Sequence, residues 1–83
     1  MDLVVLDKLL QIYDILPSEF TMQDLMKMLS SDFNYHTVRA QLLCLVEHGA
    51  LHKAKKSYHK NFRTITGWFR EYIKDPIKVK ALS

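Results

Sequence analysis

The side chains of this 83-residue chain that could do chemistry are cations and hydrogen-bonding groups gathered between residues 34 and 63. A polar and aromatic run, NYHTVRA, comes first, and lysines follow from residue 53. Cations bind phosphates, and polar side chains can also reach base edges, so the set suits nucleic-acid recognition. The candidate DNA-binding residues are Asn34, Tyr35, His36, Thr37, Arg39, Ala40, Lys53, Lys55, Lys56, Lys60 and Arg63.

Other kinds of site find little support in the sequence. A metal site needs three or four convergent ligands, and His48 and His52 stand on either side of Gly49, so they cannot share a helix face. No Gly-rich phosphate loop, paired carboxylates or nucleophile with an evident base is present. We therefore expect no metal, no cofactor and no enzyme activity. We expect the single cysteine, Cys44, to be a small core residue, with a redox switch as the alternative.

The charge of the chain is divided along its length. The net charge is +3, but residues 1–34 carry two basic and six acidic side chains, a net charge of −4. Residues 35–83 carry ten basic and three acidic side chains, a net charge of +7. This polarity predicts that one face of the protein meets a polyanion. The alternative is a basic hairpin that is only solvated.

The N-terminal sequence does not resemble a signal peptide. Asp2 and Asp7 replace the usual basic start, and the apolar run 3–6 is short. No stretch approaches the roughly 20 apolar residues of a membrane-spanning helix. We therefore expect a single cytoplasmic domain, residues 1–83, with no membrane partner.

Four helices and a hairpin are predicted to position the candidate residues, because apolar side chains recur at helical spacing and a β-branched, aromatic run follows the lysines. Pro17 ends the first helix, and Gly49 ends the third. Thr21 and Asp24 form a capping pattern at the start of the second helix. The predicted helices are residues 3–16, 21–30, 35–48 and 67–75, and the predicted hairpin, residues 51–66, has strands at 51–57 and 62–66.

The connections are predicted less directly. Residues 58–61, YHKN, are expected to form the hairpin turn, with Tyr58 or His59 at the tip and able to enter a minor groove. Thr66 is a candidate cap for the last helix, and Asp75-Pro76 should end it. The remaining tail is expected to be an extra strand or disordered.

The third predicted helix carries a recognisable motif. Residues 37–51, TVRAQLLCLVEHGAL, match every fixed position of T-V-R-x-x-L-x-x-L-x-x-x-G-x-[LV], and residues 21–25, TMQDL, match T-x-x-[DE]-L. This pattern resembles the recognition helix of winged helix-turn-helix regulators of the GntR type, and it shares its spacing with those of the MarR type. The chain departs from the GntR pattern because its hairpin has no Gly-x-Gly turn and these 83 residues include no large effector domain.

The resemblance implies a recognition helix in the major groove and a wing hairpin on the DNA backbone. Arg39 could then bind the O6/N7 edge of a guanine, and Asn34 and Thr37 could contact phosphates. The hairpin cations would follow the backbone without reading sequence. Arg39 could instead be solvated or pair with an acidic side chain. Leu43 is not explained by groove reading, because it falls on the predicted reading face.

The sequence therefore predicts a mainly α fold with a small β-hairpin, a winged helix-turn-helix in the order α-α-α-β-β-α. The predicted function is a DNA-binding transcriptional regulator of the kind frequent in prokaryotes and their viruses. Double-stranded DNA would be its partner. Residues 3–16 and 67–75 offer more apolar surface than one small core needs, so we expect a homodimer through these two helices. The alternative is a winged-helix module that binds other proteins and not DNA.

Overall fold

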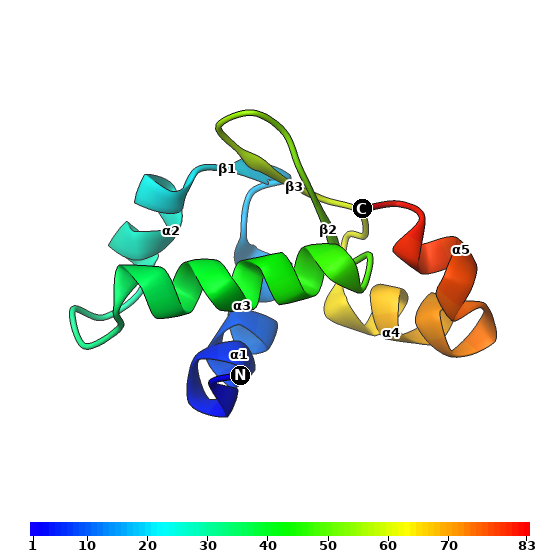
Figure 1. Ribbon diagram of the computed structural model, residues 1–83, viewed down its shortest axis with the longest axis horizontal. Helices are drawn as coiled ribbons and strands as arrows, with labels where there is room; N and C mark the ends of the chain where they lie inside the picture. The colour runs from blue at the N-terminus through cyan, green and yellow to red at the C-terminus, as the bar shows by residue number, and fades with distance from the viewer.

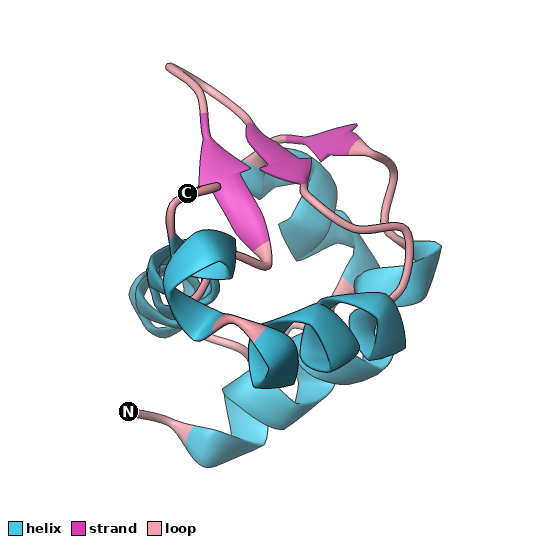
Figure 2. Cartoon of the chain, turned by 90° about the vertical axis from the view of Figure 1, so that its right-hand side faces the viewer, coloured by secondary structure: helices cyan, strands magenta, loops and turns pink.

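The computed structural model describes residues 1–83 as a mainly helical fold with a small three-stranded antiparallel sheet. Figure 1 shows α3 crossing the molecule, with α1 below it and the strands above it, and Figure 2 shows the strands gathered on one side of the helices. The elements are α1 (Leu3–Ile12), a 3₁₀ turn (Tyr13–Ile15), β1 (Glu19–Phe20), α2 (Met22–Met28), α3 (Tyr35–Glu47), β2 (Leu51–Lys53), β3 (Tyr58–Lys60), α4 (Ile65–Lys74) and α5 (Pro76–Lys80).

The first three predicted helices are confirmed, and their caps explain where they begin. The capping box at α2 is complete, because the Thr21 hydroxyl accepts from the Asp24 N–H at 3.1 Å and the Asp24 carboxylate accepts from the Thr21 N–H at 3.0 Å. These bonds hold the pKa of Asp24 below its ordinary value. Gly49 follows α3 with φ of 77°, in the left-handed region that favours glycine. The first helix is shorter than predicted, because its last turn tightens into the 3₁₀ turn.

The predicted strand at 62–66 and the turn at 58–61 are wrong. The second strand of the hairpin is Tyr58–Lys60, and the connection is made by residues 54–57, where the Ala54 N–H donates to the Ser57 carbonyl at 2.9 Å. Burial decides this register, because Leu51 and Tyr58 point into the core from neighbouring strands. Thr64 and Ile65, which read as a strand, instead cap and begin α4.

The sheet contains a strand that the sequence did not indicate. β1 pairs with β3 in the strand order β1-β3-β2, with Phe20 opposite Tyr58. The two rings stack with centroids 5.8 Å apart. A strand of two residues has no periodicity to detect, so only the pairing reveals it.

The C-terminal tail forms a helix, which corrects the expectation of a strand or disorder. Asp75 caps α5 by accepting from the Lys78 N–H at 3.1 Å, and Pro76 occupies its first turn, where a missing N–H costs nothing. Val79 is buried and lies against the backbone of Gly49. The turn that ends α3 is therefore covered by α5.

One core of 14 buried residues joins α1, α2, α3 and the sheet. Helix α3 contributes one apolar side to this core, since Val38, Leu42 and Leu45 are buried. Gln41 is buried beside them, and its Nε2 donates to the Thr37 carbonyl at 3.4 Å. The opposite side of α3, which carries His36 and Ala40, is exposed. No helix of this fold combines the length and the apolar composition that crossing a bilayer requires.

Candidate nucleic-acid interface

The start of α3 lies at the surface and presents a mixture of polar and aromatic groups. Asn34 caps the helix, with its Oδ1 accepting from the N–H groups of His36 at 2.9 Å and Thr37 at 3.2 Å. Tyr35 and His36 are exposed, and their rings meet edge to face with centroids 5.5 Å apart. The Asn34 oxygen is therefore occupied by the helix itself, while Tyr35, His36 and Ala40 remain open to a ligand.

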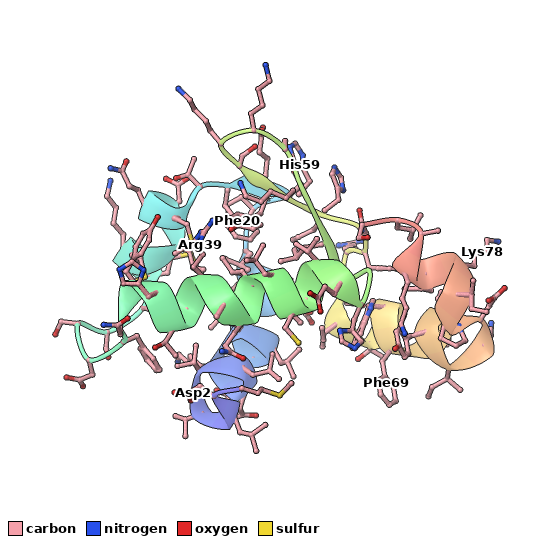
Figure 3. The ribbon with its side chains drawn as sticks, viewed as in Figure 1. Asp2, Phe20, Arg39, His59, Phe69 and Lys78 are labelled. Atoms are coloured by element: carbon pink, nitrogen blue, oxygen red, sulfur yellow. The ribbon has the colours of Figure 1, made fainter.

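Arg39 does not stand alone on the outer face of α3. Figure 3 shows it on the side of α3 that faces α2 and the sheet. It lines a shallow hollow of about 360 Å³ between α2, α3 and the hairpin. We call this the basic hollow, and its main lining residues are Thr21, Tyr35, Arg39, Lys53, Lys56 and Tyr58. No carboxylate lines it, so a helix and a hairpin that are separate in sequence contribute three cations to one place.

The three hairpin lysines differ in how firmly they are held. Lys53 Nζ lies 5.0 Å above the Tyr58 ring and donates to the Ala54 carbonyl at 3.3 Å and the Lys55 carbonyl at 3.5 Å. Lys55 and Lys56 are exposed on the turn itself. Lys53 is thus fixed over the hollow, and the other two lysines are free to follow a polyanion.

Lys60 does not join the other candidate cations. Its Nζ donates to the carbonyls of Asp14 at 3.4 Å and Leu16 at 3.2 Å, and it lies 4.9 Å above the Tyr13 ring. Burial lowers its pKa. Lys60 therefore ties β3 to the turn after α1. Arg63 is exposed in the segment between β3 and α4, and it does not line the basic hollow.

The expectation that Tyr58 or His59 forms the tip of the hairpin is wrong. Tyr58 is 2% exposed and belongs to the core. His59 points to the other side of the sheet, where its ring stacks on that of His52 with centroids 4.7 Å apart and its Nε2 lies 3.3 Å from a Glu19 carboxylate oxygen. The Ser57 hydroxyl donates to the same carboxylate at 2.9 Å. Glu19 is therefore engaged away from the basic hollow.

The remaining titratable side chains do not converge. No group of three His, Cys, Asp or Glu side chains lies close enough to hold a metal ion. Cys44 is half-buried, with its Sγ 3.9 Å from His48 Nδ1, and that histidine nitrogen also lies 2.9 Å from the Cys44 carbonyl. Leu43 is half-buried and is not among the apolar residues that pack against the core.

What the sequence did not reveal is the buried position of Tyr58 beneath the basic hollow. One signal could have found it, since Lys55-Lys56 between Ala54 and Ser57 is a polar turn, which makes YHK a strand with alternate residues inside. Comparison of the chain with protein-family models, with curated proteins and with solved structures found no match. The function must therefore be argued from the geometry.

Proposed function

We propose that this protein is a DNA-binding transcriptional regulator with a winged helix-turn-helix fold. The strand order β1-β3-β2, with α2 and α3 between the first two strands in sequence, supports that fold. In this proposal α3 enters the major groove with its N-terminal half, and the β2–β3 hairpin lies on the phosphate backbone. Figure 1 shows α3 lying beneath the hairpin, an arrangement that would let both meet the same duplex.

The observation that carries the proposal is the basic hollow. Arg39 from α3 meets Lys53 and Lys56 from the hairpin with no carboxylate among the lining residues. Three cations brought together without acidic partners repel one another, and a polyanion relieves that repulsion. If the hairpin were only solvated, nothing would require Lys53 and Lys56 to lie beside Arg39 of α3.

Binding should be tested by fluorescence anisotropy with random duplex DNA at several salt concentrations. The logarithm of the binding constant should fall against the logarithm of salt with a slope of at most about −3.6, the limit reached if Arg39, Lys53, Lys55 and Lys56 each neutralise a separate phosphate. Affinity per protomer would then drop by at most roughly 150-fold between about 50 and 200 mM. Lys55→Ala should reduce the slope by about one for every sequence, and Lys56→Ala should reduce it by up to about one.

A matched control is Lys78→Ala. Lys78 is exposed on α5, far from the hairpin in Figure 3, so removing its charge should leave the slope unchanged. The alternative function, a module that binds another protein, is favoured by Leu43 on the outer side of α3. Failure of the wild-type protein to bind any duplex at about 50 mM salt would exclude the DNA proposal and favour that alternative.

A dimer completes the proposal. Leu3 and Val4 of α1 and Phe69 and Ile73 of α4 are more than half exposed, although they are large and apolar. Two copies joined through these helices would present two α3 helices to successive turns of DNA, which suits a pseudo-palindromic site.

A further inference from the structure

The floor of the basic hollow contains a polar atom without a partner. The Tyr58 Oη is fully buried and has no hydrogen-bond partner. The tyrosine ring that carries it is held in place by stacking on Phe20. Buried polar groups are almost always paired, so such an atom calls for an explanation. Either the fold tolerates the free-energy cost of an unpaired buried hydroxyl, or a ligand supplies its hydrogen-bond partner.

The surroundings of the hydroxyl show which kind of partner is missing. Burial raises the pKa of Tyr58, and the nearby Arg39 opposes the rise. The hydroxyl therefore stays protonated at neutral pH and has a hydrogen to donate. Arg39 and Lys53, which lie against Tyr58, have only N–H donors and cannot accept that hydrogen. Arg39 lies close enough to lower the pKa of the hydroxyl through its charge and as a side-chain hydrogen-bond donor. It offers no acceptor, so the hydrogen of the hydroxyl is left without a partner.

We propose that the basic hollow binds one phosphate group of the DNA backbone, with three cations around it and the Tyr58 hydroxyl donating from the floor. This inference rests on the proposed DNA binding and assigns a new role to Arg39. A phosphate carries acceptor oxygens in a tetrahedral arrangement, so it can take hydrogen bonds from α3 and the hairpin together. The Arg39 guanidinium offers a planar pair of donors that matches two of these oxygens.

The assignment changes which residues read the sequence. If Arg39 holds a phosphate, it fixes the register of α3 and carries no sequence information. Base contacts then fall to the exposed residues beside it on α3, His36 and Ala40, and to Leu43 one turn further on. Leu43 would contact a thymine methyl group, which accounts for an apolar side chain on that face.

The test is a binding titration with a duplex chosen by selection from a random pool, in which each phosphate in turn is replaced by a neutral methylphosphonate. We expect one position in each half-site to weaken wild-type binding about tenfold, the usual effect of losing hydrogen bonds to a charged group. Arg39→Lys and Tyr58→Phe should each bind the unmodified duplex about tenfold more weakly and should no longer respond to that position.

Lys55→Ala provides the matched control, because Lys55 is a hairpin lysine that does not line the hollow. It should weaken binding yet respond to the same methylphosphonate as the wild-type protein does. Thermal unfolding of Tyr58→Phe separates a folding defect from a binding defect. Since this change removes an unpaired buried hydroxyl, the variant should melt at or above the wild-type temperature while it binds DNA more weakly.

Two results would overturn the assignment while leaving DNA binding intact. In the first, each methylphosphonate reduces the affinity of Arg39→Lys by the same factor as it reduces that of the wild-type protein. Replacing one guanine by 7-deazaguanine would then weaken the wild-type protein but not Arg39→Lys. In the second, inorganic phosphate alone shifts the NMR signals of Arg39 and Tyr58 while no duplex position is coupled to them. Absence of binding to every duplex would instead overturn the proposed function itself.

Discussion

Tyr13 links the end of α1 to both sides of the hairpin. It is completely buried at the end of α1, and its hydroxyl lies 2.6 Å from the Ala50 carbonyl and 3.1 Å from the Phe62 carbonyl. The same oxygen accepts from the Phe62 N–H at 3.3 Å. Through this one group α1 holds the residues that flank the hairpin on both sides.

Tyr13→Phe should therefore destabilise the fold. The ring would still fill its place, but the Phe62 N–H would lose its partner and the Ala50 carbonyl would keep only the Asn61 N–H. An unsatisfied buried polar group costs about 1–3 kcal/mol. Urea unfolding followed by circular dichroism measures this difference. Tyr35→Phe is the matched control, because its exposed hydroxyl should change the free energy of unfolding by less than about 0.5 kcal/mol. Equal stability of the Tyr13→Phe and wild-type proteins would contradict the prediction.

The same tyrosine should make stability sensitive to alkaline pH. Burial raises the pKa of Tyr13 from 10.0 to about 12. The folded state then retains the proton when the unfolded chain loses it, so this stabilising contribution is complete below pH 10.0 and disappears as the pH rises to about 12. Chemical unfolding at a series of pH values should show a steeper loss for the wild-type protein than for Tyr13→Phe. Parallel curves for the two proteins across this range would contradict the assignment.

Sequence patterns predicted the local role of a residue well and its distant partners poorly. Thr21 was recognised as a helix cap because a cap binds N–H groups only two or three residues away. Lys60 was grouped with the hairpin cations, yet it is bound to the carbonyls that follow α1. Tyr58 was placed at a turn although it is in the core, because its burial depends on pairing with Phe20.

The same contrast holds for whole elements. Helices α2 and α3 were found from apolar spacing and caps, and their observed ends lie within two residues of those predicted. The hairpin was found but its second strand was placed four residues too late. The run FRTIT has the β-branched composition of a strand, but Thr64 caps α4 by accepting from the Gly67 N–H at 3.0 Å. Tertiary packing of Tyr58 decided the register.

The turn between α3 and β2 has room for glycine alone. A Cβ on Gly49 would lie 2.0 Å from the Val79 carbonyl oxygen, and the backbone has φ of 77°. Gly49→Ala should cost at least about 1–2 kcal/mol from the left-handed backbone, and it should also displace α5. Hydrogen exchange of the α5 amides should therefore speed up more than that of α1.

Gly67→Ala is the matched control for this change. Its Cβ would meet only the Thr64 Oγ1 at 3.2 Å, and alanine favours a helix over glycine by up to about 1 kcal/mol. We expect Gly67→Ala to leave the free energy of unfolding unchanged or to raise it. If Gly49→Ala proved as stable as Gly67→Ala, with α5 still protected from exchange, the close contact between α3 and α5 would be refuted.

On the scale of the whole molecule, the polar and apolar surfaces separate. Figure 1 places the hairpin above α3 and the N-terminus of α1 below it. The basic hollow lies on the hairpin side. An apolar hollow lies between α1 and α4, and it is lined by Leu10, Ile65, Trp68 and Phe69 with Thr66 at its edge. This arrangement is the one that the proposed function requires, with a polyanion on one side and a second copy on the other.

The apolar side continues along both helices. Leu3 lies two turns before Leu10 on the same face of α1, and Ile73 follows Phe69 by one turn of α4. Within the chain α4 is held by Ile65 and Trp68, which both pack against the core, and Trp68 donates from Nε1 to the His48 carbonyl at 2.8 Å. The rest of the apolar face of α4 is left uncovered, which is the arrangement expected of an interface.

Sedimentation of the wild-type protein should therefore show a dimer at tens of micromolar, and Phe69→Gln should weaken it by roughly 10–100-fold, because a buried aromatic side chain typically anchors an interface. Met28→Gln is the matched control, since Met28 is an exposed apolar residue on α2, outside the apolar hollow. It should leave the dimer unchanged. A wild-type protein that sediments only as a monomer would refute the dimer. Loss of the dimer in Met28→Gln but not in Phe69→Gln would move the interface away from α1 and α4.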